Sequence, residues 1–342
     1  MFKQILVPLD GSPRAERAIP VAARLARASG GSVVLLRAVS MPIEFWHSLV
    51  PEPGLAQKVV DADLANTEKY LVGIKTTPAL DGVPTETVAL FGPPASTILS
   101  VAHSSHADLI VLCSHGYRGM TRWVLGSVAE KVVRHAPIPV FVLREEGPVP
   151  AGPHPDTARP LRALVPLDGS SLAKTAIEPA ANLIAALAAP AQGALHLVRV
   201  VKPIASESEE KDSEGSEQFL HKAKRYLSST VEHLRGGLMA RVIADFKLPV
   251  TWSVAVDTDV AEAIIRVAEN GEDAEGAGVF GRCDLIAMAT HGYNGMQRWA
   301  MGSITERVLS ATKLPLLIIR PPDLMDKSHV TWDTSTLADI QA

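Results

Sequence analysis

The sequence predicts an α/β protein of two tandem doubly wound domains, each a five-stranded parallel sheet with helices on both faces. Three observations carry this prediction. The chain repeats itself, strand-like and helix-like segments alternate along it, and the strand-like segments are continuous apolar runs. Such runs are typical of parallel strands, because both faces of a parallel sheet are covered by helices.

The repeat is visible at two places. The heptapeptide LVPLDGS occurs at Leu6–Ser12 and again at Leu164–Ser170, and residues 114–144 align without a gap with 290–320, where 13 of 31 positions are identical. Repeats of this length indicate a duplicated structural unit. Between the copies lies a segment with five prolines and no apolar periodicity, which is typical of a linker. The expected boundaries are a first domain at 1–145, a linker at 146–160, a second domain at 161–321 and a C-terminal tail at 322–342.

In the first copy the expected order is βαβαβαβαβ. QILVPL is a short apolar run that ends in an Asp-Gly-Ser turn signal, and the segment after it carries apolar residues on one helical face. Ser12 is the expected N-cap of this helix, Pro13 its first residue and Gly30 its stop. The expected strands are 4–9, 32–39, 85–90, 107–112 and 138–144, and the expected helices are 13–29, 55–75, 94–106 and 127–136.

The second copy repeats the scheme with insertions. Its expected strands are 162–167, 194–201, 249–256, 284–290 and 315–320. Two acidic stretches, 206–217 and 269–282, have few apolar side chains to bury, and we expect both to be solvated loops.

Composition excludes several classes of protein. The chain has 342 residues and a net charge of −4, so no basic excess marks a nucleic-acid binder. The N-terminus lacks the long apolar region of a signal peptide, and no apolar run is long enough to cross a membrane. Two cysteines, Cys113 and Cys283, cannot form a disulfide framework and fit a reducing compartment. We expect a cytoplasmic protein that binds neither nucleic acid nor membrane.

Ligands of open parallel sheets bind at the carboxyl ends of the strands, where the strand order switches. The fourth strand of each copy leads through a glycine-containing loop to Gly126-Ser127 or Gly302-Ser303, where a helix begins. Free N–H groups and the helix dipole suit phosphate there. A turn that needs glycine, with serine as the N-cap, is the alternative. The loops match neither GxGxxG after the first strand nor a P-loop, which disfavours both nucleotide-binding motifs.

Asp10 and Asp168 follow the first strand of each copy. Their carboxylates could accept hydrogen bonds from a ribose hydroxyl or a base amino group, or they could cap the turn. His115 and His291 precede the glycine turns without a cluster of metal ligands, so a turn histidine is favoured over a catalytic base. Nothing in the sequence makes a positive case for a catalytic centre or a metal site.

These residues resemble the universal stress protein family, over both copies. Its ATP-binding members carry Gly-x2-Gly-x9-Gly-Ser/Thr after the fourth strand, and this chain matches from the second glycine on, at Gly116 to Ser127 and Gly292 to Ser303. The first glycine is replaced by Cys113 in one copy and Ala289 in the other. If that place needs a glycine-only backbone, a Cβ costs about 1–2 kcal/mol; if it needs only a small residue, alanine costs little.

The resemblance implies the adenine nucleotide alpha hydrolase-like fold and an ATP-binding regulatory role in stress. Asp257 and Asp259 would oppose an ATP tail if they face the site, unless a divalent cation such as Mg²⁺ bridges them to the phosphates. The resemblance also implies pairing of the last strands about a two-fold axis, which a tandem chain can satisfy internally as a pseudo-dimer; a homodimer of whole chains and an unknown protein partner stay open. The nucleotide-binding positions that it assigns are Pro8, Asp10, Ala38, Cys113, Gly116, Gly126, Ser127 and Val128 in the first copy, and Pro166, Asp168, Val200, Ala289, Gly292, Gly302, Ser303 and Ile304 in the second.

Two alternatives stay open beside this interpretation. A nucleotide-free interaction protein of the same fold is favoured by the replacements at Cys113 and Ala289. Slow ATP hydrolysis is conceivable, although no general base is evident, and an adenylating enzyme is disfavoured because LDGSPRAE lacks the paired glycines of a phosphate-gripping loop. Asp257 and Asp259 add negative charge after the third strand of the second copy, where Asp259 is also a candidate helix N-cap.

Overall fold

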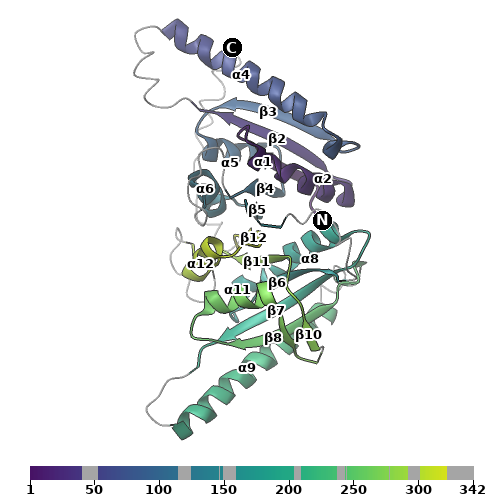
Figure 1. Cartoon of the computed structure of the whole chain (residues 1–342), viewed down its shortest axis with the longest axis vertical. Coiled ribbons are helices and arrows are strands. Elements are labelled where there is room, and N and C mark those ends of the chain that lie inside the picture. Colours follow the sequence, from purple (N-terminus) through teal and green to yellow (C-terminus); the bar gives the residue numbers. More distant parts are fainter. Residues whose placement is uncertain are drawn as a thin grey trace.

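A computed structural model describes residues 1–40, 53–114, 125–145, 147–148, 159–203, 209–236, 243, 245–276, 278–291 and 301–321. Its strands form one ten-stranded sheet that runs the length of the molecule (Figure 1), in the order β3-β2-β1-β4-β5-β12-β11-β6-β7-β8. Within each half the neighbouring strands are parallel. The strands are β1 (Gln4–Pro8), β2 (Ser32–Val39), β3 (Thr85–Phe91), β4 (Leu109–Cys113), β5 (Val140–Leu143), β6 (Leu161–Pro166), β7 (Gly193–Val201), β8 (Val250–Val256), β11 (Leu285–Ala289) and β12 (Leu316–Ile319).

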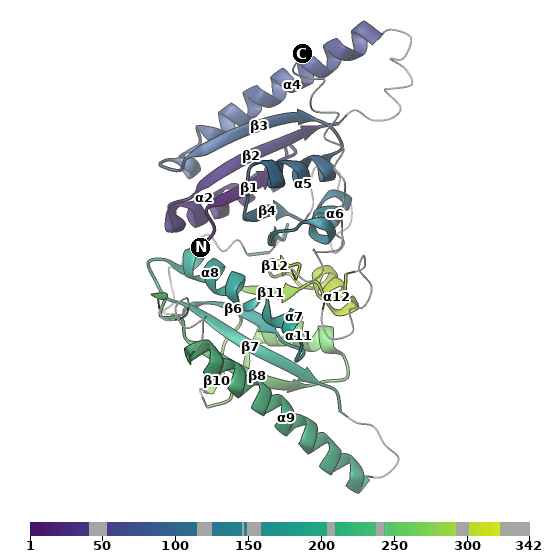
Figure 2. The ribbon, with the colours of Figure 1, turned by 180° about the vertical axis from the view of Figure 1, so that it is seen from behind.

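Helices cover both faces of the sheet, which confirms the doubly wound α/β fold in each half (Figures 1 and 2). One face carries α1 (Pro13–Glu16), α2 (Ala18–Ser29) and α4 (Pro53–Lys75), and in the second half α7 (Ser171–Lys174), α8 (Ile177–Ala188) and α9 (Glu209–Gly236). The other face carries α5 (Pro94–Ser104), α6 (Ser127–His135), α11 (Val260–Asn270) and α12 (Ser303–Ala311). A short 3-10 helix spans Pro78–Leu80. Among the described residues, no helix is both long and apolar enough to span a membrane.

The helix expected after the first strand is interrupted. It begins as predicted, with Ser12 as N-cap and Pro13 in the first turn, and ends at Gly30 in the left-handed conformation with φ 62°. A break at Arg17 divides it into α1 and α2. Pro20 explains the break, because it has no N–H to donate to the carbonyl four residues earlier, and its ring clashes there. In the second half, where α7 and α8 are also separate, Pro179 lies one residue beyond the position equivalent to Pro20.

The two acidic stretches are not the solvated loops that their composition predicted. Residues 209–217 form the beginning of α9. In the other stretch, β9 (Glu272–Ala274) and β10 (Gly278–Phe280) pair as an antiparallel hairpin. Ala274 and Phe280 are buried in the core beside α11. Two apolar side chains on one face of a short hairpin are enough to hold it against the sheet. The mean hydropathy of the acidic segment does not reveal them, because the charged residues around them dominate the average.

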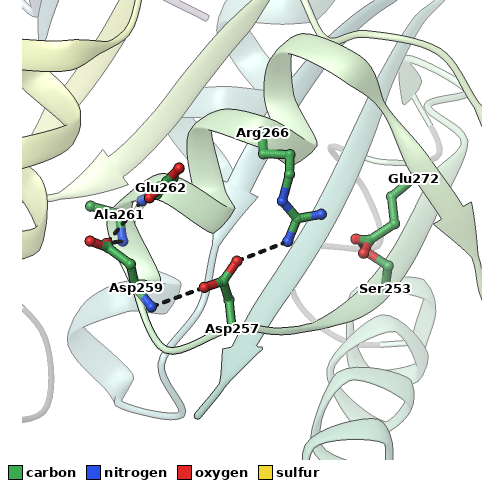
Figure 3. Close-up of polar contacts among 7 residues, drawn as sticks. All are labelled: Ser253, Asp257, Asp259, Ala261, Glu262, Arg266 and Glu272. Carbon is green, nitrogen blue, oxygen red and sulfur yellow. Dashed lines mark hydrogen bonds and ion pairs between the residues drawn. The ribbon is translucent and has the colours of Figure 1, made fainter. Parts of the chain in front are cut away.

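A buried polar chain lies beneath this hairpin. Ser253 on β8 donates to Glu272 Oε2 at 2.8 Å, and its oxygen lies 2.9 Å from Nε2 of His196 on β7 (Figure 3 shows the serine and the glutamate). Thr251 Oγ1 lies 2.8 Å from the other ring nitrogen. Burial, followed by the charge of Arg162, lowers the pKa of His196 to about 3, so the ring is neutral at pH 7. The ring of Phe280 packs on it, with the centroids 3.9 Å apart.

The two halves join through antiparallel pairing of β5 with β12, with Phe141 opposite Leu317. Both side chains are fully buried. On one face α2 packs against α8, and Arg24 donates to the carbonyls of Leu187, at 2.5 Å, and of Ala189 at the end of α8. Each of the two hydrophobic cores, one on either face of the sheet, therefore continues from one half into the other.

Arginines reinforce the junction. Arg144, which follows β5, is buried and donates to the carbonyl of Leu309 in α12, and its burial lowers its pKa to about 10. Arg134 of α6 bridges Glu130 of its own helix, at 3.0 Å, and Glu306 of α12, at 3.2 Å. A buried guanidinium needs such acceptors, because an unpaired charge in the core is strongly unfavourable.

Truncation of the junction core should destabilise the whole chain. We expect Phe141→Ala to lower the free energy of unfolding by about 3–5 kcal/mol, since it leaves a cavity where both halves meet. Urea denaturation followed by circular dichroism measures this. Phe219→Ala on α9 is the matched control: its ring is 52% exposed, and its loss should cost below about 1 kcal/mol. Equal effects of the two substitutions would contradict the junction assigned to Phe141.

Candidate functional site

The candidate site of each half lies where the strand order reverses. β1 pairs with β4 on one side and with β2 on the other, and β6 pairs in the same way with β11 and β7. Parallel strands end at the same edge, so the loops after β1 and β4 emerge side by side. The end of β2 lies next to them, as the Leu9 N–H donates to the carbonyl of Leu36 at 2.7 Å. This edge is the usual ligand site of open α/β sheets.

The loop after β1 is an aspartate turn. Asp10 Oδ1 accepts hydrogen bonds from the Ser12 N–H at 2.9 Å and its hydroxyl at 2.6 Å, and Ser12 Oγ in turn accepts from the Ala15 N–H at 3.2 Å. In the second half, Asp168 Oδ1 receives the same two bonds from Ser170, at 2.9 and 2.6 Å. Asp10 and Asp168 therefore both cap the turns in which they lie. Both aspartates are exposed at the edge of the sheet, where a ligand can also reach them.

The first-glycine positions lie inside strands. Cys113 is the last residue of β4 and Ala289 the last of β11, so both have extended backbone that any residue adopts. The Cys113 thiol donates to the carbonyl of Arg14 in α1 at 2.9 Å and packs in the core on the α1 face, whereas α6 covers the opposite face. Burial raises its pKa to about 12. A Cβ at these two positions therefore carries no backbone penalty. Whether a ligand fits beside them depends only on the space around the Cys113 and Ala289 side chains.

The helix after each loop begins at glycine. Gly126 is the N-cap of α6 and Gly302 that of α12, and neither cap has a side-chain hydrogen bond. Their N–H groups donate to the carbonyls of Ser114 and Thr290, both at 2.8 Å, which ties each helix start to the end of the neighbouring strand. The alternative in which serine is the N-cap is wrong, because Ser127 and Ser303 are the first helical residues and point to solvent as exposed side chains.

The remaining assigned positions surround this edge or lie outside the described residues. Val128 is exposed, whereas Ile304, Pro8, Pro166, Ala38 and Val200 are half-buried. Gly116 and Gly292 lie outside the described residues. The structure therefore places the ends of β1, β2 and β4, and the start of α6, around one edge, with the same arrangement in the second half.

The second half carries a charged loop that the first half lacks. Asp259 is the N-cap of α11: its Oδ1 accepts from the N–H groups of Ala261 and Glu262 at 3.1 Å (Figure 3), and its Oδ2 pairs with Arg307 of α12 at 2.5 Å. Asp257 accepts from the Asp259 N–H at 3.0 Å and pairs with Arg266 at 3.2 Å. Hydrogen bonds from Arg307 and from the backbone lower the pKa of Asp259. Each carboxylate is thus matched by an arginine, and neither adds uncompensated negative charge.

His291 lies at the start of the second-half loop. It is buried, and its Nδ1 lies 3.0 Å from Thr290 Oγ1. Its Nε2 has no hydrogen-bond partner among the described residues. The His291 Cα is 3.9 Å from the place of a Cβ on Gly302, so the backbone of His291 adjoins the N-cap of α12.

One further pair of residues at this edge was missed in the sequence analysis. Arg37 and Arg199, near the ends of β2 and β7, place their guanidinium groups against the glycines of the aspartate turns: a Cβ on Gly11 would be 3.0 Å from Arg37 Cζ, and one on Gly169 would be 3.2 Å from Arg199 Nη2. These glycines have φ of 87° and 100°, a region that favours glycine. The equivalent placement of one arginine in each copy, just before Ala38 and Val200, is the pattern that would have identified them.

The described part of this edge offers groups that can bind an anion. In the part of the chain that the structure describes, no three side chains of His, Cys, Asp or Glu lie close enough to hold a metal ion. The N-termini of α6 and α12 offer N–H groups and the positive end of a helix dipole, which suit an anion. The nearby aspartates and arginines provide hydrogen-bonding groups for the remainder of a ligand.

The buried thiols should be nearly inert. At pH 8 a thiol with a pKa of about 12 carries little thiolate, so Cys113 and Cys283 in the folded chain should react with a disulfide reagent about 1000-fold more slowly than in urea. Thiol labelling followed by peptide mass spectrometry separates the two cysteines. Labelling of folded Cys113 at the rate of a free thiol would show that its bond to Arg14 is not maintained.

The cap at Asp259 should show a defined pH dependence. Its folded-state pKa is lowered, so the stabilisation is complete above the unfolded value of about 3.9 and is lost as the pH falls through the folded value. Asp259→Ala should therefore lower the urea midpoint at pH 7, and the difference from the wild type should shrink below about pH 3.9. Asp63→Ala, at an exposed position of α4, is the control and should change little. A difference that does not depend on pH would contradict the role of the ionised carboxylate.

Comparisons with known proteins agree with this geometry. The sequence pattern of the universal stress protein family matches residues 1–144 and 161–320. A Thermus aquaticus protein described as "Universal stress protein in QAH/OAS sulfhydrylase 3'region" is 35% identical over 145 residues, which is 42% of this chain and 100% of that protein.

Two solved structures share the fold over nearly the whole chain. A Pseudomonas aeruginosa protein of unknown function has a TM-score of 0.55 at 17% identity, and 95% of this chain and 94% of that chain are covered. A universal stress protein from Archaeoglobus fulgidus has a TM-score of 0.51 at 18% identity, with 93% and 96% covered. Since the family pattern covers nearly all of both halves, this chain belongs to the universal stress protein family.

Proposed function

We propose that this chain is an ATP-binding regulatory protein of the stress response, which holds adenine nucleotide at the N-termini of α6 and α12 in one or both halves. Membership of the family supports the stress-response role. The observation that carries the nucleotide proposal is the start of each helix at a glycine N-cap without a side-chain hydrogen bond, at the carboxyl edge of a parallel sheet. A phosphate group would occupy the place that a capping side chain leaves open.

The aspartates and the ends of β2 and β7 would provide the other half of the proposed site. Asp10 and Asp168 are exposed beside the helix starts, and they would accept hydrogen bonds from ribose hydroxyls. Ala38 and Val200 would contact the base. Mg²⁺, if it accompanies the nucleotide, would be bound mainly by the phosphates, because Asp257 and Asp259 already pair with Arg266 and Arg307.

Nucleotide binding has stronger support in the second half than in the first. Ala289 is smaller than Cys113 at the first-glycine position. The buried Nε2 of His291 has no partner among the described residues, and the backbone of His291 adjoins Gly302, the N-cap of α12. An unsatisfied buried nitrogen costs about 1–3 kcal/mol, which a hydrogen bond to a ligand would offset. We therefore propose that the second half is occupied before the first.

Nucleotide binding would stabilise the folded state of this chain, and through that stabilisation it would affect the binding of partners. A ligand that binds only the folded state stabilises it in proportion to the logarithm of its concentration over Kd. We also propose that the chain is an intramolecular pseudo-dimer, because its β5–β12 pairing uses the last strand of each half. Both cysteines are free thiols, which supports a cytoplasmic location.

The second candidate function is a nucleotide-free interaction protein. The observation that favours it is the presence of a Cβ at both first-glycine positions, Cys113 and Ala289. The direction of the Cys113 thiol, toward Arg14 rather than toward α6, weakens this objection to nucleotide binding in the first half. The absence of binding at millimolar Mg-ATP in both halves would favour this second function.

The nucleotide proposal is tested by the content of the purified protein and by calorimetric titration with Mg-ATP. We expect Gly302→Val to abolish binding in the second half and Gly126→Val in the first, because a branched side chain would fill the anion position. A Cβ on Gly302 already lies 3.1 Å from the Thr290 carbonyl oxygen. Loss of two or three charge-assisted hydrogen bonds corresponds to a decrease in affinity of about 100-fold or more.

Gly73→Val is the matched control, because Gly73 lies on an exposed turn of α4 with open space around its Cα. It should leave the affinity unchanged, and circular dichroism should show that all three variants are folded. Unchanged affinity in both Gly126→Val and Gly302→Val would mean that the nucleotide, if bound, lies elsewhere.

A further inference from the structure

The two halves differ in charge immediately after their aspartate turns. Glu16 in α1 and Lys174 in α7 occupy equivalent positions, each four residues after the Ser of the repeated LVPLDGS. Both helices lie at the ligand edge: α1 contacts the end of β4 through the bond from Cys113 to Arg14, and α7 contacts β11. The duplicated structure therefore carries opposite charges at one place beside the proposed nucleotide.

In the first half, Glu16 offsets a nearby arginine. The Arg37 guanidinium carbon lies 5.0 Å from the centroid of the Tyr70 ring, and the Tyr70 hydroxyl donates to Glu16 Oε1 at 2.8 Å. Burial and the neighbouring Glu16 raise the pKa of Tyr70. With Asp10 close by, the cluster of Asp10, Glu16 and Arg37 has a net charge of −1.

In the second half, two cations share one aromatic ring. Arg199 Cζ and Lys174 Nζ each lie 4.9 Å from the centroid of the Tyr226 ring. The helix α7, with the sequence SLAK, contributes no carboxylate. With Asp168 included, the cluster of Asp168, Lys174 and Arg199 has a net charge of +1, which is two units more positive than its counterpart.

Other charges at these edges reduce this difference without reversing it. Arg14 is paired with Glu145 at 2.8 Å. Arg17 has no charged counterpart in the second half, where Thr175 replaces it, but its guanidinium donates to the carbonyls of Arg144 and Gly147 at the junction. With these included, the second half is still more positive by one unit. The charged loop of the second half is neutral as a whole, because Asp257 and Asp259 each pair with an arginine. The charge comparison is therefore confined to the residues around Tyr70 and Tyr226.

We propose that the two halves select adenine ligands of different charge, and that the residue at position 16 or 174 is a specificity-determining residue of each. The second half, with Lys174 and Arg199 around Tyr226, takes a ligand with a polyphosphate tail. The first half, with Glu16 beside Arg37, takes one of lower charge, such as a nucleoside or a monophosphate. The inference rests on the proposed adenine-nucleotide function and assigns the ligand class of each half.

Exchange of the two charges tests this inference. Lys174→Glu is made in a Gly126→Val background, so that only the second half binds, and Glu16→Lys in a Gly302→Val background. Titration calorimetry at low salt measures ATP and adenosine against each. We expect Lys174→Glu to weaken ATP binding about fivefold and Glu16→Lys to strengthen it by a similar factor, with adenosine affinity unchanged, since a charge acts over about a Debye length.

Three comparisons make the result specific. Lys174→Gln should give an intermediate loss of ATP affinity and serves as the second variant if the glutamate substitution impairs folding. Lys247→Glu, exposed just before β8 at the opposite edge of the sheet, makes the same change in net charge and should have no effect. The fivefold effect should also decrease as salt is added.

Two outcomes distinguish a failure of the charge selection from a failure of the proposed nucleotide binding. If ATP and adenosine bind, but their affinity ratio is the same in Lys174→Glu, Glu16→Lys and the parent proteins, the charge selection is overturned and the nucleotide site stands. If neither compound binds to either single-half protein or to the intact chain, both the inference and the proposed function are overturned.

Discussion

The antiparallel pairing of β5 with β12 is the contact on which the rest of the structure depends. It unites two five-stranded sheets into one, buries Phe141 and Leu317, and continues both hydrophobic cores across the junction. Without it, two apolar strands would be exposed sheet edges, which favour aggregation. The pairing also fixes α6 and α12 near one another, as the contact from Arg134 to Glu306 shows. Both candidate ligand sites therefore adjoin the part of the molecule in which the halves meet.

The candidate site depends on backbone rather than on reactive side chains. Strand polarity brings the loops after β1 and β4 to one edge, and the glycine caps leave the first turns of α6 and α12 without a capping side chain. Asp10 and Asp168 accept hydrogen bonds from the serines two residues later, so each turn is fixed by bonds within its own loop. If this site binds an anion as proposed, it would do so through a rigid framework, and its specificity would come from the charges placed around it.

The sequence predicted the ten long strands, because continuous apolar runs between turn signals are hard to mistake when the same order occurs twice. It did not predict the break at Arg17, which requires attention to Pro20 and the carbonyl four residues before it. The hairpin at 272–280 was missed, since two buried side chains, Ala274 and Phe280, decide its position within an acidic segment.

At the site, the turn residues and helix starts were predicted from their spacing, but the identity of the caps was not. Gly126 and Gly302, rather than the serines that follow, have the N-cap conformation. The contacts of Arg37 with Tyr70 and of Arg199 with Tyr226 join residues far apart in the sequence. No local pattern predicts such pairs, because they depend on how α4 and α9 pack on the sheet.

The hairpin of β9 and β10, present in the second half alone, is a difference that two identical subunits could not have. In a dimer of identical subunits, every substitution appears twice, so an improvement at one site must be tolerated at the other. A chain that contains both subunits is free of that restriction. Glu16 and Lys174, or Val34 and the His196 that occupies the equivalent strand position, can diverge independently while the shared sheet holds the halves together.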